Sequence, residues 1–186
     1  MKRKLISSII IVGVILVGLL GYKHLGTAES NGGIWGLSKS YETLEDIKAD
    51  ADLVVRVHVP LYYDIREFRG EGGTVKQAIY EVAIDEVFLN RTGQGFDEES
   101  DIVVNQVIGM KDRKAAEYTS EQGMKPMKTG EYLLFLNKVS HPADGIVYYV
   151  SNSPQHLYKW RGNKTFKNIA SDELVEITYS DLTGGE

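Results

Sequence analysis

The sequence predicts a mainly β domain, either a closed antiparallel barrel or a compact sandwich, on three observations. Short segments with alternating apolar and polar residues recur along the chain, as expected for strands that bury one face. Turn-forming residues separate these segments. No long amphipathic helix lies between them, which argues against the crossover connections of a parallel sheet. Five main strands, a terminal hairpin and one or two short helices are therefore expected.

The chain begins with a segment typical of a membrane anchor. Lys2, Arg3 and Lys4 make residues 1–4 a basic cluster, and residues 5–22 carry no charge. As a helix this uncharged run would be about 27 Å long, close to the roughly 30 Å hydrocarbon core of a bilayer. We therefore predict a transmembrane helix at 5–22, with the basic cluster in the cytoplasm and the rest of the chain outside.

Cleavage of this segment as a signal peptide is the alternative. Gly26, Thr27 and Ala28 are small residues that would allow cleavage after Ala28, and the protein would then be secreted. The apolar run is longer than the usual signal-peptide core of about 7–15 residues. Tyr22 and Lys23 are also typical of a membrane interface, so the anchor is favoured.

Composition excludes several classes of function. The chain has no cysteine, which rules out disulfides, thiol nucleophiles and thiolate metal sites. An extracytoplasmic domain without disulfides fits a Gram-positive bacterium. Four of the 21 basic and one of the 26 acidic residues precede residue 31, which leaves 17 and 25 and a net charge of −8 beyond it. So acidic a domain opposes phosphate binding, and no nucleic-acid partner is expected.

Two changes in composition set the remaining boundaries. Residues 23–40 are rich in Gly, Ser, Asn and Thr, which predicts a flexible linker. Apolar periodicity begins after this linker, so one extracytoplasmic domain is expected at 41–186, long enough to bury a core of its own.

This domain is expected to begin with a short helix and a strand. Ser40 or Thr43 can cap the helix, whose apolar residues share one face: Leu44, Ile47 and Ala51. The pattern then changes to alternation over 53–59, which predicts the first strand, and Pro60 ends it. A charged loop is expected at 60–74.

Four more strands and a hairpin are expected beyond this loop. The second strand, at 78–89, changes apolar phase near Glu86, which predicts a bulge there. The acidic loop Asp97–Asp101 follows, and a helical turn is expected around Lys114–Tyr118. The other strands are expected at 101–108, 131–139 and 145–151, the hairpin at 156–169, and a short helix from Ser171 through Leu182.

The strand at 131–139 is apolar on both faces, which a half-solvated strand would avoid. One face carries Tyr132, Leu134 and Leu136, and the other carries Leu133 and Phe135. One set is expected to fill the barrel. The other set is either covered by the 44–51 helix or exposed to a partner, and covering is favoured because large exposed apolar patches are uncommon.

Three stretches, within about 44–150, resemble in order and spacing a loose group of small extracytoplasmic proteins of Gram-positive bacteria. They are LEDIKADADLVVRVHV, then YEVAIDEVFL with DIVVNQVIG, and last MKTGEYLLFLNKV with YYV. The resemblance implies a leader or anchor followed by one small five-stranded barrel similar to an OB-type fold. A glycine pair often follows the third strand in that group, where this chain has Ile108, Gly109 and Met110. The group has no settled activity, so the resemblance implies no catalytic residue.

Motifs for catalysis, cofactors and metals are absent from the sequence. The four histidines show no paired metal spacing, and no G-x-S-x-G or S-x-x-K sequence is present. The acidic loop Asp97–Asp101 lacks the order of a calcium loop, so a solvated turn is expected there. We expect no metal or cofactor requirement and do not favour an enzyme. A cell-wall hydrolase that uses scattered carboxylates is the alternative.

Aromatic residues are the best candidates for a binding surface. Four of them cluster near the C-terminal strands: Tyr148, Tyr149, Tyr158 and Trp160. Tyr148 and Tyr149 are consecutive, so they must point to opposite faces of their strand. Exposed aromatics are common binding anchors, although an aromatic layer that closes the barrel is the favoured interpretation of this cluster. Tyr62 and Tyr63 lie together in the expected loop. The sequence thus predicts a binding or scaffolding module at the cell surface, with a protein or cell-wall partner.

Overall fold

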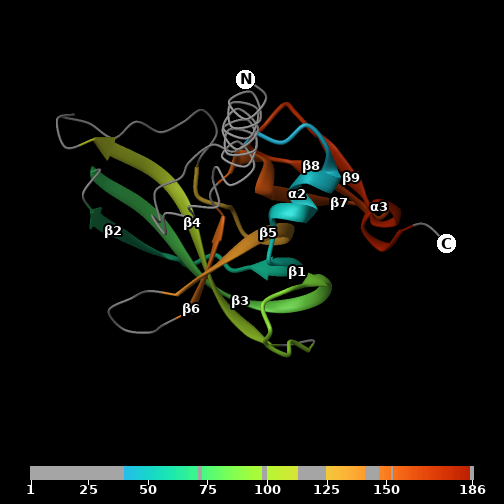
Figure 1. The fold of residues 1–186 in the computed structure, drawn as a ribbon, viewed down its shortest axis with the longest axis horizontal. Helices are drawn as coiled ribbons and strands as arrows, with labels where there is room; N and C mark the ends of the chain where they lie inside the picture. Colours follow the sequence, from blue (N-terminus) through green and yellow to red (C-terminus); the bar gives the residue numbers. More distant parts are fainter. Residues whose placement is uncertain are drawn as a thin grey trace, which may run out of the picture. The chain divides into compact units, whose positions relative to one another are not determined.

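A computed structural model describes residues 40–70, 73–97, 100–112, 125–140, 147–151 and 153–184 of the 186-residue chain (Figure 1). All of them belong to one unit, Trp35–Glu186. The expected anchor at 5–22, the linker up to residue 39 and the turn around Lys114–Tyr118 lie outside the described residues. Within those residues, no helix has the length and hydrophobicity needed to cross a membrane.

The expected first helix is confirmed as α2, Leu44–Asp50. Thr43, and not Ser40, caps it. The Thr43 hydroxyl accepts from the Asp46 N–H at 3.1 Å, and the Asp46 carboxylate accepts from the Thr43 N–H at 3.1 Å. This reciprocal pair is a capping box, which fixes where the helix begins. Ile47 points inward and is fully buried.

Nine strands of the described chain form one sheet (Figure 1). Their bounds are β1 Leu53–Val59, β2 Asp64–Gly70, β3 Gly73–Asn90, β4 Asp101–Asp112, β5 Gly130–Ser140, β6 Val147–Ser151, β7 Leu157–Gly162, β8 Thr165–Asn168 and β9 Glu176–Thr178. A short 3-10 turn, η1 (Pro154–His156), precedes β7, and a short helix, α3 (Tyr179–Thr183), follows β9. The prediction of a mainly β domain is confirmed.

Five of these strands close into a ring in the order β1, β3, β4, β6, β5 and back to β1. Neighbours in the ring are antiparallel except β4 and β6, which pair parallel through Val104 and Tyr149. The expectation of a wholly antiparallel barrel is therefore wrong. The reason is geometric: a closed ring with an odd number of strands must contain at least one parallel pair.

The two faces of β5 contribute to two separate cores. Tyr132, Leu134 and Leu136 point into the ring. Leu133 and Phe135 point outward and are fully buried beneath α2 and the strands β7, β8 and β9, which lie together in Figure 1. The prediction that this second face is covered is confirmed. The cover is larger than expected, because the C-terminal strands contribute Tyr158, Phe166 and Ile177.

The charged loop expected at 60–74 is wrong, because it contains all of β2 and the start of β3. The sequence of β2 is DIREFRG. Its charged and apolar residues do not alternate regularly, and nearly all of its side chains are exposed. Its extended conformation comes from pairing with the long strand β3, from Asp64 opposite Ile79 to Gly70 opposite Gly73. Because β2 buries neither face, its sequence shows no apolar–polar alternation that would predict a strand.

Other local predictions are confirmed, with one correction at the C-terminus. The irregularity expected near Glu86 is confirmed. The register of β1 against β3 shifts between Val54 and Val55 and again between Arg56 and Val57, and Arg56 is the partner of Glu86. The hairpin is confirmed as β7 and β8. The short helix expected from Ser171 through Leu182 is confirmed only at its end, as α3, because residues 176–178 instead pair with β8 as β9 and the helix begins at residue 179.

Candidate functional site

The four aromatics predicted as a binding surface do not lie on one surface. Tyr158 is fully buried in the second core, where its ring meets Phe135 edge-on at 5.8 Å. Trp160 follows on the same face of β7, is half-buried and packs against Phe166 at 4.8 Å. The prediction is wrong for Tyr158, because the C-terminal strands cover this face of β7.

Tyr148 and Tyr149 point to opposite faces of β6, as alternation requires. Tyr149 is 3% exposed and packs against the ring core, with its ring edge-on to Phe96 at 5.8 Å. Tyr148 is half-buried and points to the outer face. Of the four predicted residues, Tyr148 is the one that lines the larger surface cavity described next.

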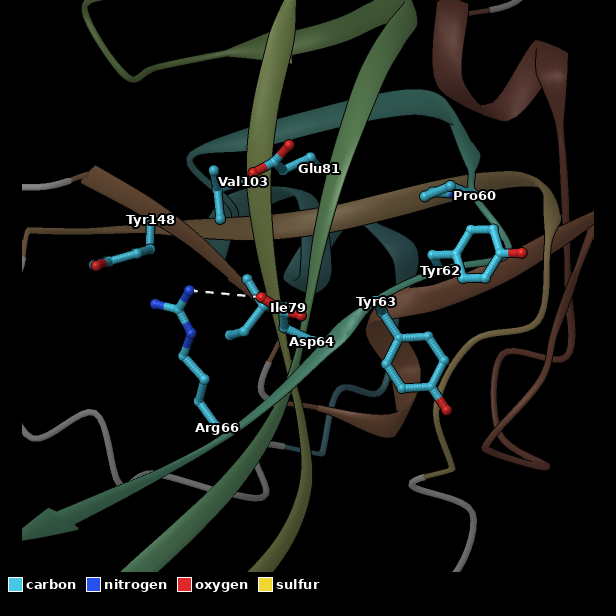
Figure 2. Close-up of a pocket in the computed structure, with 9 residues that line it drawn as sticks. All are labelled: Pro60, Tyr62, Tyr63, Asp64, Arg66, Ile79, Glu81, Val103 and Tyr148. Atoms are coloured by element: carbon cyan, nitrogen blue, oxygen red, sulfur yellow. Dashed lines mark ion pairs between the residues drawn. The ribbon is translucent and has the colours of Figure 1, made fainter.

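This cavity lies on the outer face of β3 and β4 and has a volume of about 690 Å³, within the range of about 300–1,000 Å³ typical of ligand sites. Figure 2 shows Tyr62 and Tyr63 together at one end and Arg66 with Tyr148 at the other. Its lining comes from the β1–β2 connection and from β2, β3, β4 and β6: Pro60, Tyr62, Tyr63, Asp64, Arg66, Ile79, Glu81, Val103 and Tyr148.

The strand register places the side chains that come from β2, β3, β4 and β6 on one face. Asp64 of β2 lies opposite Ile79 of β3. Glu81, two residues further along β3, lies opposite Val103 of β4. Directly opposed residues of antiparallel strands share a face. Since Tyr80 and Tyr149 point into the ring, their neighbours in sequence point outward.

The aromatic end of the cavity belongs to an exposed apolar segment. Four of the six exposed large hydrophobic residues in the described chain lie between residues 61 and 65: Leu61 (65% exposed), Tyr62 (83%), Tyr63 (38%) and Ile65 (51%). The aromatic ring of Tyr63 lies 5.2 Å from that of Tyr80, a residue of the core inside the five-stranded ring. Tyr62 is the most exposed of the set, and exposed aromatics are frequent binding anchors.

The polar groups of the cavity are two carboxylates and one guanidinium. Arg66 contacts Asp64 at 3.7 Å, and both side chains are more than half exposed, so the pair adds little stability. Glu81 is exposed on the neighbouring strand. With the tyrosine hydroxyls, these groups can both donate and accept hydrogen bonds. Of the residues that line the cavity, Tyr148 was predicted from the sequence as part of a binding surface, and Tyr62 and Tyr63 only as a pair in a loop.

A smaller hollow of about 320 Å³ lies beside the cavity and shares Val103 with it. Its lining includes Phe96, Tyr149 and Asp101. The Tyr149 hydroxyl donates to the side-chain carbonyl of Gln94, and burial raises the pKa of Tyr149. The hollow therefore adjoins the core inside the ring, and the hydroxyl of Tyr149 is already hydrogen-bonded to Gln94.

Metal-ligand clusters are absent from the part of the chain that the structure describes. His58 is exposed on β1 and His156 is buried beside Tyr41, at 3.1 Å from its hydroxyl. In the acidic loop, the Asp97 N–H donates to the Ser100 hydroxyl at 3.1 Å, while residues 98 and 99 lie outside the described residues. The absence of a metal requirement stays a prediction.

Tyr158 is buried without a hydrogen bond to its hydroxyl. The Asn168 amide lies near this hydroxyl and opposes the effect of burial on the Tyr158 pKa, but its hydrogen bonds of good geometry go to other groups. Its Nδ2 donates to the Pro154 carbonyl at 3.2 Å, and its Oδ1 accepts from the Ala170 and Ser171 N–H groups at 2.8 and 2.7 Å. Burial raises the pKa of Tyr158 to about 12.

Alkaline pH is expected to destabilise the domain. Burial raises the pKa values of Tyr41 and Tyr80 as well as that of Tyr158, so the folded chain keeps protons that the unfolded chain loses near pH 10. Stability is therefore constant below about pH 10 and falls as pH rises toward the folded pKa values, by up to about 1.4 kcal/mol per pH unit for each tyrosine. Urea unfolding between pH 8 and 11 measures this.

Tyr158→Phe is the control for this effect. It removes one of the titrating groups, so the free energy of unfolding should fall less steeply at alkaline pH. It also removes a buried hydroxyl without a hydrogen bond, so stability at pH 8 should stay unchanged or rise slightly. An unfolding free energy that stays level up to pH 11 in the natural chain would contradict the assignment.

Comparison of the chain with protein-family models, with characterised proteins and with solved structures finds no match. No relative therefore supplies roles for individual residues. The function has to be argued from the cavity, the strand order and the N-terminal sequence.

Proposed function

We propose that this protein is a membrane-anchored extracytoplasmic module with an OB-like barrel that binds a cell-wall glycan on the outer face of β3 and β4. The observation that carries the proposal is the cavity there, bordered by the exposed aromatics Tyr62 and Tyr63. The two tyrosine rings lie beside the polar side chains of the cavity, Asp64, Arg66 and Glu81, which can form hydrogen bonds to a ligand.

The order of strands supports the OB-like part of the proposal. Along the chain, the ring strands are β1, β3, β4, β5 and β6, and the third of them pairs with the fifth instead of the fourth. This is a Greek-key connection, as in the five-stranded OB barrel, which binds oligonucleotides and oligosaccharides on its second and third strands. Here those strands are β3 and β4, which carry the cavity.

Charge and chemistry favour a glycan among these ligands. A net charge of −8 beyond residue 30 repels a phosphate backbone. A sugar ring offers apolar C–H faces that can stack on Tyr62 and Tyr63, and hydroxyl groups that can bond to Asp64, Arg66 and Glu81. The cavity is an open surface, which suits a segment of an extended polymer.

Tyr62→Ser is expected to weaken binding of soluble peptidoglycan fragments by more than about tenfold, because truncated hot-spot aromatics cost about 2 kcal/mol or more of binding energy. Tyr62 is 83% exposed, so stability should change by no more than about 0.5 kcal/mol. Calorimetric titration of the detergent-solubilised chain measures the affinity. Ile169→Ser, at an exposed residue away from the cavity lining, is the matched control.

Equal affinities for Tyr62→Ser and the natural chain would contradict this proposal, as would the absence of any glycan binding. Shortened glycan in the titration would instead support the hydrolase alternative, for which Asp64 and Glu81 would be the carboxylates to test.

The location is proposed from residues 5–22 and the basic cluster before them. A C-terminally tagged chain should fractionate with membranes, and protease added to intact protoplasts should remove the tag. A protected tag would contradict the proposed orientation. Tagged protein in the culture medium would instead support cleavage after Ala28.

A further inference from the structure

β2 is an edge strand with one side open. It pairs with β3 through its whole length, from Asp64 to Gly70, and no other strand of the described chain pairs with it. Figure 1 shows it at the margin of the sheet. Ile65, the second residue of β2, is 51% exposed. An open strand edge has main-chain N–H and C=O groups that can pair with a strand from another molecule.

The sequence of β2 is complementary to itself. Asp64, Ile65 and Arg66 form an acidic, apolar, basic triplet, and Glu67, Phe68 and Arg69 repeat it. In a two-fold antiparallel pair centred on Ile65, each Asp64 lies opposite the Arg66 of the second copy. Opposite charges that face each other across two strands stabilise the pair, and like charges destabilise it.

Other symmetric registers are less favourable. A pair centred on Arg66 or on Glu67 would place two identical charges directly opposite each other. A pair centred on Phe68 would cover a residue that is already half-buried and leave the more exposed Ile65 nearer solvent. The Phe68 register would also join opposite charges, Glu67 with Arg69. The register centred on Ile65 joins opposite charges and in addition covers the more exposed apolar residue.

We propose that two copies of this chain associate through β2, antiparallel and centred on Ile65, so that their two sheets become continuous. Asp64 and Arg66 line the cavity in each copy, so the pairing would bring two glycan-binding faces next to each other. Two linked sites raise the overall affinity for a polymer through effective concentration. The pairing itself does not depend on the proposed glycan ligand.

Cysteine crosslinking tests the pairing, because the natural chain has no cysteine to interfere. Residues directly opposite in an antiparallel pair have Cα atoms about 4.5–5.5 Å apart, which is within disulfide reach. The full chain in membranes, carrying Ile65→Cys, should therefore form a disulfide-linked dimer under mild oxidation without added glycan. Glu67→Cys is the matched control on the same strand, because its two copies would lie about 14 Å apart.

A charge exchange in the Ile65→Cys chain tests the register. Asp64→Arg should lower the crosslinked fraction by roughly tenfold, because it places like charges opposite each other. Adding Arg66→Asp restores complementary pairs and should restore the crosslink. The proposal is overturned by any of three results: no dimer with Ile65→Cys, equal dimer with Glu67→Cys, or no response to Asp64→Arg. Because no glycan is present, a failure of glycan binding leaves this result unaffected.

Discussion

Phe135→Ala is expected to lower the free energy of unfolding by about 3–5 kcal/mol, the range for deleting a buried aromatic ring. Phe135 is fully buried in the second core, although it lies on the outer face of a ring strand. Its ring meets Tyr158 edge-on at 5.8 Å. The substitution would leave a cavity between β5 and its cover, and the surrounding elements could collapse into it only in part.

Urea unfolding of a chain shortened to residues 31–186 measures this cost. Leu134→Ala, which points into the ring, should cost about 2–5 kcal/mol. Ile169→Ala, at an exposed position, should change stability by no more than about 0.5 kcal/mol. A large loss for Leu134→Ala together with almost none for Phe135→Ala would contradict the covered second face.

Gln106→Leu is expected to cost about 3–5 kcal/mol, because it leaves several buried polar groups without partners. Gln106 is fully buried on β4. Its Oε1 accepts from the Tyr80 hydroxyl at 3.1 Å and from the Met127 N–H at 3.0 Å, and its Nε2 donates to the Lys125 carbonyl at 2.8 Å. One amide side chain thus joins the ring interior to the segment that precedes β5.

Tyr80→Phe is the graded control for this network. It removes one of the hydrogen bonds to Gln106 and keeps the ring, so a smaller loss of about 1 kcal/mol is expected. Both variants are measured by urea unfolding. A Gln106→Leu chain as stable as the natural one would show that these bonds do not support the fold.

Elements with local signals were predicted well from the sequence. The helix α2 begins where Thr43 and Asp46, three positions apart in the sequence, form a capping box. The strand β1 alternates from Val55 to Val59, and Val54 before it is buried in the second core. The strand β5 is apolar on both faces, which correctly indicated two cores.

Elements that depend on distant partners could not be predicted. β2 buries no face, so its sequence lacks alternation, and its strand conformation follows from the length of β3. β9 has three residues with one buried side chain, Ile177, which is too short for a periodic pattern. The parallel pairing of β4 and β6 follows from the closure of an odd number of strands into a ring. Local sequence patterns do not show which strands pair.

The candidate site was found only in part for the same reason. Alternation showed that Tyr148 and Tyr149 point to opposite faces, but not which face is covered. Tyr158 is buried, and Trp160 half-buried, in the core that β8 and β9 complete. Exposure of Tyr62 could have been predicted from the sequence. Tyr62 and Tyr63 lie in a segment without the apolar periodicity of a core strand or helix, so the segment has no face that would bury both rings.

The most direct test of the proposed function is an NMR titration of the isotope-labelled chain, shortened to residues 31–186, with soluble peptidoglycan fragments. We expect backbone amide shifts to concentrate in the cavity lining, above all at Tyr62, Tyr63, Arg66 and Glu81, while the amides of the second core around Phe135 stay unchanged. Shifts confined to another face of the domain, or no shifts at saturating fragment concentration, would contradict a glycan-binding site on β3 and β4.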